Sequence, residues 1–72
     1  MALQKRSFSL AGHRTSVALE PEFWAALVAL AEGRGVALSA LVAEVDAARG
    51  AGQPLASGLR VAALVKDVLT IR

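Results

Sequence analysis

Few side chains in this sequence could carry out acid–base or metal chemistry. The chain has a single histidine, His13, and no cysteine, which excludes thiolate metal sites and a disulfide framework. Glu44 and Asp46 lie two residues apart in a helical pattern, so they occupy different faces and make a poor general acid–base pair. Phosphate-binding glycine loops, nucleophile elbows and metal-ligand spacings do not occur. We therefore predict a protein that is not an enzyme and that uses no metal, haem or other cofactor.

The basic residues suggest a different chemistry, which is attraction to an anionic partner. Residues 1–19 contain Lys5, Arg6 and Arg14 and no acidic residue, for a charge of +3. Residues 20–72 contain five basic and six acidic residues, for a charge of −1, so the net +2 comes entirely from the N-terminal quarter. Such asymmetry is typical of an arm or strand that meets nucleic acid or another anion.

The same region alternates between polar and apolar residues, as an extended strand does. Over Arg14–Leu19, one face would hold Thr15, Val17 and Leu19 and the other Arg14, Ser16 and Ala18. Ser7–Leu10 alternates similarly, and Ala11-Gly12 allows a bend between the two stretches. We predict a strand over Arg14–Leu19 and a second strand or ordered arm over Ser7–Leu10. One short strand is not stable alone, so it pairs either with Ser7–Leu10 in a hairpin or with its own copy in a dimer.

Helical periodicity begins at Pro21, a residue well suited to the first position of a helix. The apolar face of this first helix, which runs to about Glu32, combines five residues: Phe23, Leu27 and Leu30, flanked by Trp24 and Val28. The aromatic pair is interpreted as core or dimer interface rather than as a ligand-stacking site. The stretch Gly33-Arg34-Gly35 ends the helix.

Two further helices are expected. The second covers Leu38–Arg49 and starts after Ala37, where a capping residue is usual, although Ser39 is close enough to substitute. Its predicted buried residues are Leu38, Leu41, Val42 and Val45. Gly50–Pro54 breaks the chain, and a third helix follows from residue 56 or 57 to about Leu69. Its predicted buried residues are Leu59, Leu64, Val65, Val68 and Leu69. We detect no internal repeat.

Length and composition indicate one small domain. A chain of 72 residues has a marginal core, and 56% hydrophobic residues with 19% charged ones favour burial against a second copy. The longest apolar run, Phe23–Ala31, is far shorter than the roughly 20 residues that span a bilayer, and no secretory segment is seen. We expect a cytoplasmic location. The predicted organisation is a basic arm at 1–13, a core at 14–50 and a C-terminal helix at 54–72 that completes the same domain.

The order of strand, helix, glycine-containing turn and helix resembles the ribbon-helix-helix family of small dimeric DNA-binding proteins. It is most similar to a bacterial subgroup that begins with Lys-Arg-Ser. The resemblance spans nearly the whole chain from residue 5 and rests on five stretches: Lys5-Arg6-Ser7, Gly12–Val17, Glu20–Trp24, Leu38–Arg49 and Leu59–Val61. It implies a mainly α fold in which two chains pair their strands antiparallel, with helices on the inner face and DNA on the outer face.

The resemblance also implies roles for individual residues. Arg14 would reach a guanine edge or a phosphate, Ser16 would hydrogen-bond a base, and Ala18 would touch a thymine methyl group. Lys5 and Arg6 would add attraction to phosphates. The start of the second helix, near Ser39, would meet a phosphate through free backbone N–H groups. These six residues are the candidate DNA-binding set.

Two departures from the family leave two hypotheses open. Ser16 and Ala18 are shorter than the long polar residues of the better-known DNA readers, and Ala37 replaces the usual Ser or Thr. The first hypothesis is a homodimeric DNA-binding protein that regulates transcription through its β-ribbon. The alternative is a dimeric protein-interaction or structural module of the same fold that does not bind DNA, which the low net charge and the apolar third helix favour.

Overall fold

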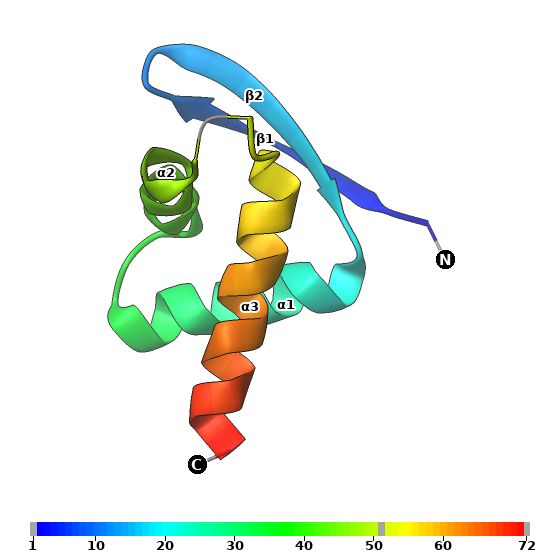
Figure 1. Ribbon diagram of the computed structural model, residues 1–72, viewed down its shortest axis with the longest axis vertical. Coiled ribbons are helices and arrows are strands. Elements are labelled where there is room, and N and C mark those ends of the chain that lie inside the picture. Colours follow the sequence, from blue (N-terminus) through cyan, green and yellow to red (C-terminus); the bar gives the residue numbers. More distant parts are fainter. Residues whose placement is uncertain (1, 51, 72) are drawn as a thin grey trace.

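Two strands are followed by three helices in the computed structural model, which describes residues 2–50 and 52–71, with side chains through residue 65. The elements in chain order are β1 (Gln4–Leu10), β2 (His13–Leu19), α1 (Pro21–Arg34), α2 (Leu38–Ala48) and α3 (Leu55–Ile71). The hairpin of β1 and β2 lies across one side of the helices (Figure 1). The mainly α fold expected from the sequence is confirmed.

Both strands of the ribbon come from one chain. β1 and β2 pair antiparallel in a two-stranded sheet, with Ser7 opposite Ser16 at the centre of the register. Of the two pairings that the sequence left open, the structure has the hairpin. The predicted second strand over Ser7–Leu10 exists and is longer than expected, because it begins at Gln4. Residues expected to form a basic arm are therefore ordered as a strand.

A two-residue turn joins the strands. Ala11 and Gly12 both have positive φ, at 51° and 81°, as the central residues of a type I′ turn do. This turn has the same right-handed twist as the strands that it joins, so it fixes the register of the hairpin. Gly12 adopts this conformation without strain, whereas the Cβ of Ala11 makes it unfavourable there.

Alternate hairpin residues face the helices and form part of the core. Phe8, Leu10, Val17 and Leu19 are buried, and Thr15 is half-buried. The inward face predicted for Arg14–Leu19 is therefore confirmed. Beneath the hairpin the three helices pack against one another, with β1 in contact with α2 and β2 in contact with α3. The largest fully buried side chains of this common core are Trp24, Leu19, Leu27, Leu59 and Val42.

The buried face of α1 differs slightly from the predicted one. Trp24, Leu27 and Ala31 are buried, whereas Phe23 and Leu30 are only partly buried against the core. The face is therefore rotated by about one residue toward Trp24, whose large ring fills the space under the hairpin. The interpretation of Trp24 as a core residue is confirmed, since its exposed fraction is 1%. The helix also ends later than expected, at Arg34, with Gly35 in the left-handed conformation as its C-cap.

The prediction for α3 was wrong at two positions. Leu59 is buried, but Leu64 and Val65 are 54% and 52% exposed, while Val68 and Leu69 lie outside the described side chains. The buried stripe of α3 contains Leu55, Leu59 and Ala63, which are four residues apart. Leu64 and Val65 follow Ala63 by one and two residues, so they lie about 100° and 200° around the helix from this stripe. Gly58 lies against α2, since a Cβ there would be 3.1 Å from Cγ1 of Val45.

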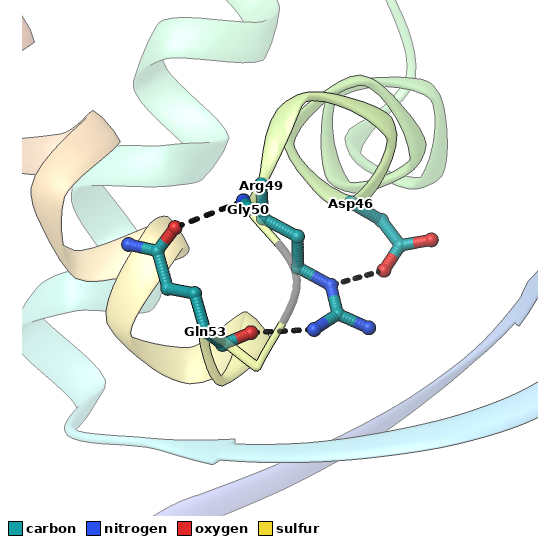
Figure 2. A network of polar contacts seen from close by, with 4 residues as sticks. All are labelled: Asp46, Arg49, Gly50 and Gln53. Carbon is teal, nitrogen blue, oxygen red and sulfur yellow. Dashed lines mark hydrogen bonds and ion pairs between the residues drawn. The ribbon is translucent and has the colours of Figure 1, made fainter.

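The turn between α2 and α3 is held by polar contacts (Figure 2). Arg49 donates through Nε to Oδ1 of Asp46 at 2.8 Å and through Nη1 to the carbonyl oxygen of Gln53. The backbone N–H of Gly50 donates to Oε1 of Gln53 at 3.3 Å. Arg49 is thus held by Asp46 at the end of α2 and contacts Gln53, which leads into α3.

No single helix of the described chain is long and apolar enough to cross a membrane. Pro21–Arg34 and Leu38–Ala48 reach that length only together, and they meet at an angle of 101°.

The turn geometry predicts that Ala11→Asn stabilises the protein. Asn tolerates positive φ better than Ala, and Asn-Gly is a favoured type I′ pair, so the free energy of unfolding should rise by about 1 kcal/mol. Urea denaturation followed by circular dichroism measures the change. Ala11→Val is the matched control, because a β-branched residue is strained at positive φ and should lower stability. Equal effects of the two substitutions would contradict this turn type.

Candidate nucleic-acid interface

The outer face of the hairpin is polar and basic. It consists of three residues from each strand: Lys5, Ser7, Ser9, Arg14, Ser16 and Ala18. All are exposed except Ala18, which is half-buried. In register, Lys5 lies opposite Ala18 and Ser9 opposite Arg14, so the two cations stand at opposite ends of the face. At its centre the hydroxyl oxygens of Ser7 and Ser16 are 3.0 Å apart and share a hydrogen bond.

Trp24 determines which side of β1 faces outward. Its indole Nε1 donates a hydrogen bond of 2.8 Å to the carbonyl oxygen of Gln4, and its ring lies 5.9 Å from that of Phe8. The guanidinium of Arg6 stands over the same ring, 5.2 Å from its centre. One buried side chain of α1 therefore contacts three alternate residues of β1. Since side chains alternate along a strand, the residues between them, Lys5 and Ser7, must point away from the helices.

The candidate DNA-binding residues fall into two groups. Lys5, Arg14, Ser16 and Ala18 share the outer face of the hairpin. Arg6 lies on the opposite side with Trp24, and Ser39 is an exposed residue in the first turn of α2, on a different element. As expected, α2 begins after Ala37, but its start has no side-chain cap, so the expectation that Ser39 substitutes as the cap was wrong.

Two residues of the outer face, Ser7 and Ser9, are absent from the candidate set predicted from the sequence. Their alternation with Phe8 and Leu10 was visible in the sequence, and it has the same form as the alternation over Arg14–Leu19. The missing information was the pairing register, which brings Ser7 beside Ser16 and Ser9 beside Arg14.

Among the described residues, the arginines outside the hairpin are paired with acidic side chains, whereas the cations of the hairpin are not. Three arginines form ion pairs of 2.8–3.0 Å: Arg34 with Glu44, Arg49 with Asp46 and Arg60 with Glu20. Among the residues that the structure describes, Lys5, Arg6 and Arg14 form no ion pair. The hairpin also contains no acidic residue, so its positive charge is available to an anion.

Glu20 joins the end of the hairpin to α3. Its Oε1 accepts hydrogen bonds from Nε and Nη2 of Arg60 at 3.1 and 3.0 Å. Arg60 also lies over the ring of Phe23, 5.7 Å from its centre. A hydrogen bond from the backbone and the bonds from Arg60 lower the pKa of the Glu20 carboxyl below its ordinary 4.5. This pair anchors the junction between β2 and α1, and therefore the hairpin, to α3.

A second surface feature lies away from the hairpin's outer face. It is a groove of about 230 Å³ between α2 and α3, lined by Val45, Ala48, Arg49, Gln53, Gly58, Val61 and Ala62. Its one charged residue, Arg49, is already paired with Asp46. Among the described residues, no group of three or more His, Asp and Glu side chains could hold a metal ion. The groove therefore offers apolar contact and no set of reactive groups.

The described chain thus has a two-stranded antiparallel ribbon laid over three helices, and the outer face of the ribbon is basic. Residues 3–66 match the family model of the ribbon-helix-helix domain, and the chain belongs to that family. No curated protein and no solved structure matches the chain.

The lowered pKa of Glu20 predicts a pH-dependent contribution to stability. Its charged form is favoured in the folded state, so the stabilisation is present above pH 4.5 and is lost as the pH falls through the lower folded-state pKa. Glu20→Gln should therefore be less stable than the wild type at about pH 6, and the difference should shrink at about pH 3. Denaturant unfolding at both pH values measures this. A difference that is independent of pH would contradict the lowered pKa of Glu20.

Proposed function

We propose that the protein is a homodimeric DNA-binding regulator of transcription that acts in the bacterial cytoplasm by inserting the outer face of its hairpin into the DNA major groove. The observation that carries this proposal is the hairpin face itself, with exposed Lys5 and Arg14, a central pair of serines and no acidic residue. The family to which the chain belongs supports a regulatory DNA-binding role rather than a catalytic one.

The dimensions and chemistry of the face suit a major groove. The groove is about 12 Å wide and accepts a two-stranded β-ribbon. Arg14 would bond a guanine edge or a phosphate, Ser16 a base of either kind, and Ala18 would contact a thymine methyl group. Lys5 would contact a phosphate at the other end of the ribbon. Ser39 would meet only a flanking phosphate, since it lies on α2.

A second copy is part of the proposal, although one chain builds the ribbon. Ribbon-helix-helix proteins typically act as dimers. Three apolar side chains on the described part of α3, Val61, Leu64 and Val65, are between 52% and 54% exposed. Apolar side chains grouped on one helix favour burial against another protein surface. A dimer would present two hairpins to the same DNA.

The same α3 residues are the observation that favours the alternative function, a protein-interaction module that does not bind DNA. The short side chains of Ser16 and Ala18 limit how far the ribbon can reach toward base edges. Apolar contact through α3 would be insensitive to salt, whereas binding through several phosphates weakens steeply between about 50 and 200 mM salt. Salt dependence therefore separates the two functions.

Selection of duplexes from a random DNA pool tests the proposal. Purified wild-type protein at physiological salt should enrich a sequence motif, which identifies a specific regulator. Retention of DNA without a motif would show binding to phosphates alone. A folded protein that retains no DNA would contradict the proposal and support the interaction module.

Arg14→Ala should weaken binding to the selected site by about 1–3 kcal/mol, with preference lost at one base position if Arg14 contacts a base. Weakening that is uniform across sequences would indicate a phosphate contact. Arg34→Ala is the charge-matched control, since Arg34 is paired with Glu44 on the helical layer. Fluorescence anisotropy measures both affinities, and equal losses for the two variants would contradict the placement of DNA on the hairpin.

A further inference from the structure

The two strands of the hairpin carry corresponding residues, nine positions apart. β1 reads Gln-Lys-Arg-Ser-Phe-Ser-Leu and β2 reads His-Arg-Thr-Ser-Val-Ala-Leu, each over seven residues. On the outer face Lys5 corresponds to Arg14, Ser7 to Ser16 and Ser9 to Ala18. The expectation of no internal repeat was therefore wrong for this region. The two strands correspond in the chemical type of most residues, although few of the residues are identical.

The pairing register turns this correspondence into a symmetry of the ribbon. Ser7 lies opposite Ser16, and the strands run antiparallel. A two-fold axis through the midpoint of this pair, normal to the ribbon, therefore places each residue of β1 on the residue nine positions later in β2. It exchanges Lys5 with Arg14 and Ser7 with Ser16. If the register were shifted by one residue, no axis through an opposed pair would exchange Lys5 with Arg14 or Ser7 with Ser16.

The same axis relates the buried side of the ribbon. It exchanges Phe8 with Val17 and Leu10 with Leu19, all of which are buried. Each strand thus presents a cation and then a serine to the outside and two apolar residues to the core. One chain thereby contains a ribbon with the local symmetry that two identical strands would have.

We infer, on the basis of the DNA-binding function proposed above, that a single chain is a complete reading unit and that β1 is its second reading strand. Ser7 and Ser9 then contact bases as Ser16 and Ala18 do, and Lys5 matches Arg14. The DNA element under one hairpin is quasi-palindromic, with its centre beneath the pair of Ser7 and Ser16.

The spacing of the cations sets the size of this element. Lys5 and Arg14 are four residue steps apart along the ribbon, or about 14 Å at the usual rise of a strand. At about 3.4 Å per base pair, the two cations lie roughly four base pairs apart.

One outer position breaks the symmetry. Ser9 has a hydroxyl group that can bond a base edge, whereas Ala18 has only a methyl group, which suits a thymine methyl. The two halves of the element therefore differ at the corresponding base pair. This difference fixes the direction in which the hairpin lies on DNA.

Paired substitutions on the two strands test the inference. Lys5→Ala and Arg14→Ala should each weaken binding to the selected duplex by about fivefold or more. Ser7→Ala and Ser16→Ala should each alter the base preference at the central base pairs when the selection is repeated. Arg34→Ala is the control, because it removes a cation that is paired with Glu44 on the helical layer, and it should leave affinity nearly unchanged.

The outcomes separate the inference from the proposed function. If the Arg14 and Ser16 variants lose binding while the Lys5 and Ser7 variants match the wild type, only the inference is wrong. If folded wild-type protein binds no DNA, both are wrong. Amide chemical shifts of the wild type during DNA titration give a readout that needs no variant. Changes at Lys5, Ser7 and Ser9 as large as those on β2 support the inference, and unchanged β1 shifts overturn it.

Discussion

The contact between Trp24 and β1 is the constraint on which the arrangement of this protein depends. The indole is buried, bonds the backbone of Gln4 and packs against Phe8 and Arg6. These three contacts fix β1 on the helices from Gln4 to Phe8. The mostly polar N-terminal segment Gln4–Leu10 is thereby held in place as β1, the strand that pairs with β2 in the ribbon. The free, basic outer face of the hairpin follows directly from this attachment.

The candidate site was half predictable from the sequence. Arg14, Ser16 and Ala18 were placed on one outward face by the alternation of polar and apolar residues alone, and the structure has them there. Ser7 and Ser9 could not be assigned to that face, because their position beside β2 depends on the turn and on the pairing register. Local alternation shows that a strand has two sides, but it does not show which other strand completes each side.

The fold was predictable to a similar extent. The starts of α1 and α2 are where proline, glycine and apolar spacing predicted them. The orientation of α3 was not predictable, because this helix is apolar on most sides and its sequence allows several buried faces. The face that packs on the core contains Leu55, Leu59 and Ala63, and it leaves Leu64 and Val65 exposed. Contacts between elements distant in sequence decided both this orientation and the extent of β1.

Isotope-filtered nuclear Overhauser spectra of an equal mixture of labelled and unlabelled protein would test most directly whether one chain builds the entire ribbon. The opposed pairs Ser7 with Ser16 and Phe8 with Thr15 give the informative contacts. We predict that these contacts appear within labelled chains and are absent from the spectrum that selects contacts between labelled and unlabelled chains. Cross-strand contacts of β1 with β2 in that second spectrum would contradict a hairpin formed within the chain.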